Sequence, residues 1–200
     1  MQNRRIWPVL ALPLIVAAAA CDNEETVDVV ALRAPLAQVN APTSGGPASG
    51  TADIAIIGNQ ALTVRISAAG LDTVVHPQFL MSGGACATSA NDTNGDGIVD
   101  INEGASAWGT ILGPIDNVLG VQTIDLAAFP SGASYTFVQT TDLGRFTNSL
   151  VTLAGAALDF TTRTVLVTGV TGPVPSTVAA IPGLTAAQSV PVLCGRIAAR

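Results

Sequence analysis

The sequence contains no lysine and only one histidine, His76, among its 200 residues. Charged residues account for 11% of the chain and aromatic residues for 4%. The chain has fourteen Asp and Glu residues and eight Arg residues, which gives a net charge of −6. This balance leaves no basic surface for binding nucleic acid or for direct binding to an anionic membrane. A single imidazole also excludes any metal or catalytic site built from several histidines.

Catalytic signatures are missing as well. The chain has no G-x-S-x-G, H-E-x-x-H, Walker or C-x-x-C motif. His76 stands in the apolar context Val74-Val75-His76-Pro77, which predicts a ring buried or half-buried at the end of a strand. Trp108 lies in an apolar run and is expected in the core. We therefore expect no enzyme, and keep as an alternative a hydrolase whose site is gathered from Asp, Ser, Thr or Arg residues.

What the chain does have is a composition typical of short strands and turns, rich in Thr, Ser, Gly, Ala and Val. Apolar residues alternate with polar ones over residues 62–67, and residues 53–57 make a hairpin with them through Gly58-Asn59-Gln60. Short helices or 3₁₀ turns are expected at residues 105–112 and 142–150. The fold class predicted is all-β, an antiparallel sandwich or barrel. Its further strands are residues 74–81, 121–129, 134–139, 163–168 and 190–197.

The N-terminus carries an export signal. Arg4 and Arg5 precede an apolar run over residues 6–20, which is short for a membrane-spanning helix but suits a signal peptide. Because the run ends in Ala-Ala-Ala-Cys, similar to a lipobox, we expect residues 1–20 to be removed and Cys21 to carry a lipid. The alternatives are an ordinary signal-peptidase site or an uncleaved anchor. The protein is thus expected in the bacterial cell envelope, held to a membrane through Cys21.

The segment after Cys21 is expected to be a disordered tether. It begins with acidic residues and ends in a stretch rich in Pro, Gly and Ser at residues 42–50. Such residues bury little apolar area, so the conformational entropy lost on ordering them would outweigh the free energy gained from burial. We accordingly predict a lipidated linker over residues 21–50 and a β-sandwich domain over residues 51–200.

The most specific motif is an acidic loop at residues 92–103. It matches the twelve-position EF-hand calcium loop D-x-[DN]-x-[DN]-G-x₅-E at each specified place. Calcium takes six to eight oxygen ligands, and the loop spacing lets them come from one winding turn. Gly97 permits the bend, and Val99 is expected in the core. The predicted ligands are Asp92, Asn94, Asp96, the Ile98 carbonyl, Asp100 directly or through water, and both oxygens of Glu103.

Two alternatives accompany this calcium loop. A solvated acidic turn would also explain Asn94-Gly95 and Asp96-Gly97, because both pairs form hairpin turns readily. The residues around the loop do not predict the flanking helices of a complete EF-hand. Pro77, Gly83 and Gly84 disfavour an entering helix, and Gly104 and Gly109 weaken an exiting one. A structural calcium ion is therefore expected rather than a calcium switch.

With Cys21 assigned to the lipid, Cys86 and Cys194 remain as an even pair in an oxidising compartment. They are expected to form a disulfide, and the alternative is two buried free thiols. Closing a loop of roughly 100 residues would contribute about 4–5 kcal/mol in the chain-entropy model.

Several stretches together resemble bacterial envelope proteins related to the CHRD domain, a β-sandwich similar in outline to copper/zinc superoxide dismutase. The resemblance is carried by Val75-His76-Pro77-Gln78, Cys86, the acidic loop, residues 108–112, residues 163–169 and residues 190–195. It implies a Greek-key sandwich over roughly residues 51–197. Members of that group commonly have further histidines where this chain has Phe79, Met81 and Thr168, so any transition-metal site of the relatives does not carry over.

Taken together, the sequence predicts a lipid-tethered β protein of the cell envelope that holds one calcium ion as a structural clip. The alternative is a calcium-dependent adhesin or glycan-binding protein, in which the ion also presents a surface to a ligand. Its partner would be an envelope protein or glycan that the residues do not identify.

Overall fold

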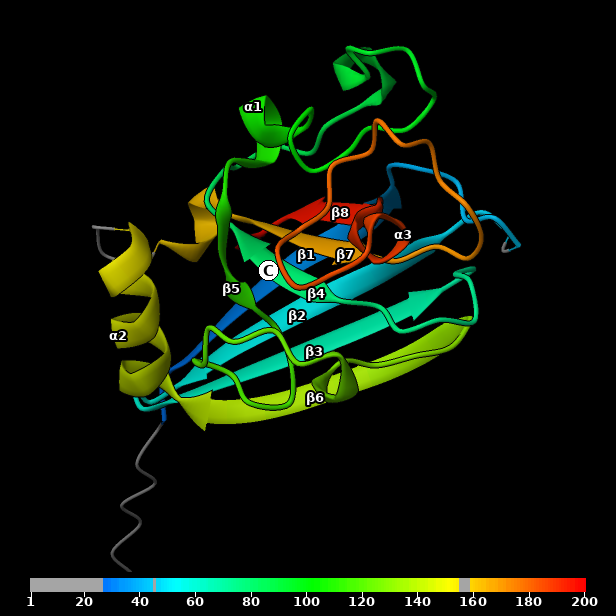
Figure 1. The fold of residues 1–200 in the computed structure, drawn as a ribbon. Helices are drawn as coiled ribbons and strands as arrows, with labels where there is room; N and C mark the ends of the chain where they lie inside the picture. Colours follow the sequence, from blue (N-terminus) through cyan, green and yellow to red (C-terminus); the bar gives the residue numbers. More distant parts are fainter. Residues whose placement is uncertain (1–26, 45, 155–158) are drawn as a thin grey trace, which may run out of the picture.

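The computed structural model describes residues 27–44, 46–154 and 159–200. Its framework is one nine-stranded sheet whose strand pairings are all antiparallel, in the order β5-β4-β7-β8-β1-β2-β3-β6 with β9 paired to β1. Figure 1 shows the sheet curled into a half-barrel. The strands are β1 (Val29–Gln38), β2 (Ser49–Ile57), β3 (Ala61–Ala69), β4 (Gln78–Met81), β5 (Ile111–Pro114), β6 (Ser134–Asp142), β7 (Thr164–Thr168), β8 (Pro191–Arg196) and β9 (Ala198–Ala199).

The mainly-β antiparallel class is confirmed, but the expected two-sheet sandwich is not what the strands form. β8 and β1 are hydrogen-bonded through the pairs Ala37↔Cys194 and Gln38↔Leu193. This short ladder joins β5-β4-β7-β8 to β1-β2-β3-β6 into one sheet. The inner faces of both halves share one core, which contains Ile66 from β3 and Val165 from β7.

The predicted tether is wrong over residues 29–38, which form β1 in the middle of the sheet. Leu32, Ala34 and Leu36 point inward and are buried, with Ala34 fully inaccessible to solvent. Pro35 is tolerated because β1 pairs with β9 at residues 32–33 and with β8 at residues 37–38, so Pro35 has no strand partner on that side. β2 also begins at Ser49, within the stretch assigned to the linker.

The predicted strands are borne out unevenly. The hairpin of β2 and β3 is confirmed, as are strands at 134–139, 163–168 and 190–197, the first extended to Asp142 as β6. From the predicted strand 74–81 only Gln78–Met81 forms β4. Residues 121–129 form a loop with a 3₁₀ turn, Leu126–Ala128, because Asp125 caps that turn by accepting a hydrogen bond from the Ala127 amide.

Helices are few. α1 (Ala105–Trp108) occupies the start of the predicted helical segment 105–112, whose end instead forms β5. α2 (Leu143–Ala154) is confirmed where residues 142–150 predicted it, and buries Phe146 and Leu150 against the core beside β5. α3 (Ala186–Ser189) is a single turn with a Thr185–Gln188 capping box.

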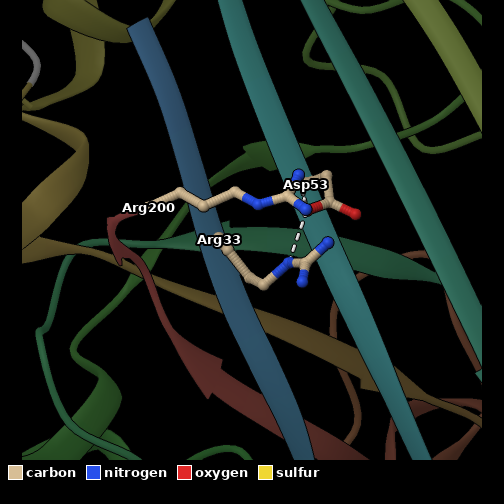
Figure 2. Close-up of polar contacts among 3 residues, drawn as sticks. All are labelled: Arg33, Asp53 and Arg200. Atoms are coloured by element: carbon tan, nitrogen blue, oxygen red, sulfur yellow. Dashed lines mark hydrogen bonds and ion pairs between the residues drawn. The ribbon is translucent and has the colours of Figure 1, made fainter.

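The outer face of β1, β2, β3 and β6 is open to solvent and carries mainly Ala, Ser and Thr side chains. Across its middle, Arg33 Nε donates to Asp53 Oδ1 at 2.6 Å, and Arg200 Nη1 lies 3.9 Å from the same oxygen (Figure 2). The Arg33 hydrogen bond lowers the pKa of Asp53. Arg200 thus contacts the sheet through an ion pair with Asp53, and the preceding β9 is hydrogen-bonded to β1.

Candidate calcium loop

The acidic loop at residues 92–103 lies between a 3₁₀ turn, Ser89–Asn91, and α1, at the top of the molecule in Figure 1. Its inner side is fastened to the core. Val99 is buried, as predicted. The Asn40 side chain accepts a hydrogen bond from the Val99 amide and donates one to the Val99 carbonyl, at 2.9 Å each. Asn40 also donates to the Pro191 carbonyl at 2.7 Å, so one buried amide side chain ties the loop to β8.

The first half of the loop is wound by its own side chains. Asp92 accepts hydrogen bonds from the amides of Gly95 at 2.8 Å and Gly97 at 2.9 Å. Asn94 accepts from the Asp96 amide, and Asp96 from the Ile98 amide. Gly97 has a φ of 88°, a conformation that side chains disfavour, which explains the glycine at this position.

The second half is held by Asp100 and Glu103. Asp100 Oδ1 accepts from the amides of Asn102 and Glu103, at 2.8 and 2.9 Å. Glu103 reaches back across the loop, where Oε1 accepts from the amides of Thr93 and Asn94 and Oε2 from the amide of Asp100. The last position of the loop therefore meets its beginning.

The exit from the loop is fixed by Trp108, which is fully buried, as expected, and donates from Nε1 to the Ile101 carbonyl at 3.2 Å. Gly104 lies against the indole ring, and a Cβ at this position would overlap it. Glycine is therefore needed here for packing.

Two further contacts connect the loop to residues 171–184, far along the chain. The Thr177 hydroxyl donates to Asp96 Oδ2, and the Ala179 amide donates to Asp100 Oδ2 at 2.7 Å. Nearby, Cys86 and Cys194 form the predicted disulfide, with their Cα atoms 5.7 Å apart. Sequence reasoning missed Asn40, Thr177 and Ala179, because no local pattern marks residues that meet only through the fold.

These hydrogen bonds stabilise the ionised carboxylates. The Thr177 hydrogen bond is the main cause that lowers the pKa of Asp96. For Glu103, burial alone would raise the pKa, but hydrogen bonds from Asp100, Asn94 and Thr93 outweigh it and lower the pKa. Both side chains are thus held as anions near neutral pH.

The residues suit calcium by chemistry, because carboxylate, amide and carbonyl oxygens are the hard ligands this ion takes. Their present arrangement is only partly that of a binding site. Within the described residues, no three Asp, Glu, His or Cys side chains are placed to share one ion. The carboxylates instead accept from backbone amides, so binding would require Glu103 and its neighbours to turn some of their oxygens inward.

The remaining candidates from the sequence have structural surroundings. His76 is fully buried, as predicted, with Nδ1 3.1 Å from the Thr168 carbonyl and Nε2 2.9 Å from the Asp72 carbonyl. Phe79 and Met81, at the places where the resemblance puts histidines, are in the core, and Thr168 is buried. Cys21 and the predicted signal peptide lie outside the described residues.

A surface hollow of about 680 Å³ lies at one end of β2, β3 and β6. It is lined largely by hydroxyl-bearing and small residues, and none of them belongs to the acidic loop: Ser49, Gly50, Thr51, Ser67, Ala68, Ala69, Ser134, Tyr135 and Thr136.

No protein-family model and no curated protein sequence matches the chain. The resemblance to the CHRD domain is therefore supported only at the level of a mostly antiparallel β-sheet protein, and no family is identified.

Proposed function

We propose that residues 92–103 bind one calcium ion, which acts as a structural clip in an exported, lipid-anchored protein of the bacterial cell envelope. The observation that carries the calcium proposal is the winding of the loop. Asp92, Asn94 and Asp96 accept from amides two to five residues ahead, so three of the proposed ligands stabilise one short turn, from which their oxygens would still have to turn toward the ion.

Electrostatics favours an ion at this place. Four carboxylates lie within twelve residues, and their mutual repulsion is relieved when a dication binds. The lowered pKa values of Asp96 and Glu103 keep these two ligands ionised well below neutral pH. Affinity in the range 10⁻⁴–10⁻³ M, typical of extracellular calcium modules, would be sufficient outside the cytoplasm.

The contacts of the loop support a structural role. Two segments distant in sequence converge on it, one through Asn40 and the other through Thr177 and Ala179, so an ion that orders the loop would also fasten these segments. The hollow on the outer face shares no lining residue with the loop, whereas a smaller hollow of about 220 Å³ is lined in part by Ile101 and Asn102 of the loop. A calcium-dependent adhesin or glycan-binding surface therefore stays the alternative to the clip.

The export part of the proposal rests on the disulfide and the N-terminal sequence. A disulfide indicates an oxidising, extracytoplasmic setting. In the described part of the chain, no helix is long and apolar enough to span a membrane. The attachment that we propose is the lipid at Cys21, which labelling with radioactive palmitate tests, with Cys21→Ala as the variant that should lose the label.

Isothermal titration calorimetry with calcium tests the metal site. The unsubstituted chain should bind one ion, and Asp92→Ala and Glu103→Gln should each reduce affinity by about tenfold or more. Asp28→Asn, which removes an exposed carboxylate outside the loop, is the matched control and should bind as the unsubstituted chain does. Equal heats from all four proteins would reject the proposal.

A further inference from the structure

The two edges of the sheet differ sharply in how they are protected. At one edge, β5 has four residues, includes Pro114, and is packed beside α2. At the other edge, β6 has nine residues and no proline, and its one charged residue, Asp142, stands at its end. Natural proteins usually shield long edge strands with prolines, charges or covering elements, because an unpaired edge is a template for another strand.

β6 is open along its whole length. Its residues alternate between exposed and half-buried, and none is buried, whereas the inward residues of neighbouring β3 are. Within the described residues, the main-chain hydrogen bonds of β6 go to β3 alone. In Figure 1, β6 forms the lower border of the sheet.

The register shows which groups are unpaired. The Leu143 amide donates to the Gln60 carbonyl, which continues the β3–β6 ladder by one pair. Because hydrogen-bonded pairs alternate in an antiparallel ladder, the odd-numbered residues of β6 face β3. The even-numbered residues therefore present their N–H and C=O groups to the open edge: Ser134, Thr136, Val138, Thr140 and Asp142.

We propose that this edge pairs with β6 of a second copy, antiparallel and centred on Val138, to form a two-fold symmetric dimer with one continuous sheet. This register uses all nine residues of β6 and brings the even-numbered residues of both copies opposite one another, so each unpaired N–H and C=O meets a partner. It depends on no metal and is independent of the calcium proposal.

The side chains of β6 are complementary to themselves in this register. Thr136 would lie opposite the Thr140 of the second copy, a pair of the kind already present between Thr63 and Thr140, whose hydroxyls are 2.9 Å apart, and between Ser67 and Thr136, at 3.2 Å. Val138, 55% exposed, would meet its own symmetry mate and lose that exposure.

The charge distribution permits a second copy at the β6 edge. The chain carries −6, so two copies repel over most of their surfaces. Along β6 the only carboxylate, Asp142, would lie opposite Ser134, and no like charges would face each other. Since the β5 edge is short and contains proline, it gives no second site for strand addition, and pairing should stop at a dimer rather than continue as a fibre.

Sedimentation equilibrium of the full chain in density-matched detergent tests the association. The unsubstituted chain should sediment as a dimer at micromolar concentration. Val138→Lys, which would place two ammonium groups side by side at the two-fold axis, should weaken the dimer on the order of 100-fold. The control Ala31→Lys puts the same charge on the exposed face three strands away and should leave the dimer intact.

Disulfide trapping tests the register. In an antiparallel hydrogen-bonded pair the Cα atoms are about 5.5 Å apart, within the reach of a disulfide. Val138→Cys should therefore give a covalent dimer on mild oxidation. Thr136→Cys alone should not, because its mate lies opposite Thr140, and the double variant Thr136→Cys/Thr140→Cys should again cross-link.

A monomer at all concentrations, or a dimer that survives Val138→Lys unchanged, would overturn the proposal. Cross-linking of Ala31→Cys in place of Val138→Cys would assign the contact to another strand and overturn it equally.

Discussion

Asp72 is a buried carboxylate that joins three segments of the chain. Its oxygens accept from the amides of Thr43, Ser44 and Thr171, and from the Ser44 hydroxyl. Burial alone would raise its pKa, but these hydrogen bonds outweigh burial and lower the pKa far below its usual value. The ionised group therefore contributes stability to the fold.

Asp72→Ala should lower the free energy of unfolding at pH 7 by about 2–3 kcal/mol, because it removes the charged acceptor that four part-buried hydrogen bonds share. The pKa is lower in the folded than in the unfolded chain, so the stabilisation is present above about pH 4 and declines as the pH falls below that value. Urea unfolding at pH 7 and pH 3 checks both parts. The control Asp28→Ala, at an exposed carboxylate, should change little, and an equal loss in both variants would contradict the role given to Asp72.

Single residues were predictable where a local pattern marks them. The burial of Val99, Trp108 and His76 follows from apolar neighbours in sequence. The roles of Asn40 and Asp72 could not be predicted in the same way, because their partners are up to 151 and 99 residues away in sequence. An isolated Asn or Asp in a loop has no sequence pattern that distinguishes a buried structural residue from an ordinary turn residue.

At the scale of elements, β1 determines where the folded domain begins. Its strand character is hidden in the sequence because Ala residues and Pro35 weaken the apolar alternation, and the contacts that decide it come from β2, β8 and β9. The hairpin of β2 and β3, by contrast, is determined by its own alternation and turn, and was predicted for that reason.

Leu32→Asp should destabilise the protein by more than 3 kcal/mol, because it buries an unpaired charge at the centre of the sheet. Ala31→Asp, one residue earlier on the exposed face, should be close to neutral. Circular dichroism melting compares the two variants. If both melted like the unsubstituted chain, residues 29–38 would be a tether after all.

At the scale of the whole molecule, the disulfide links Cys86 to Cys194, which are 108 residues apart in sequence. The double variant Cys86→Ser/Cys194→Ser should lose about 4 kcal/mol and melt roughly 10 °C lower. Reductant added to the double variant should have no further effect. A melting temperature unchanged by the substitutions would contradict a stabilising role for the bond.

The overall architecture was predictable only in part. Alternating short strands indicate an antiparallel β protein, but whether they form two sheets or one depends on the two-residue ladder between β1 and β8. A ladder that short leaves no periodic signal. The same limit applies to the acidic loop, whose spacing predicts calcium ligands but not its attachment to residues 177 and 179.

The central claim is that an ion in the acidic loop fastens distant parts of the fold, and thermal melting of the purified chain in EDTA and in 10 mM calcium tests it most directly. With a dissociation constant of 10⁻⁴–10⁻³ M, calcium should contribute about 1.4–2.7 kcal/mol and raise the melting temperature by several degrees. Glu103→Gln should lose most of this increase. Identical melting in EDTA and in calcium would contradict the account.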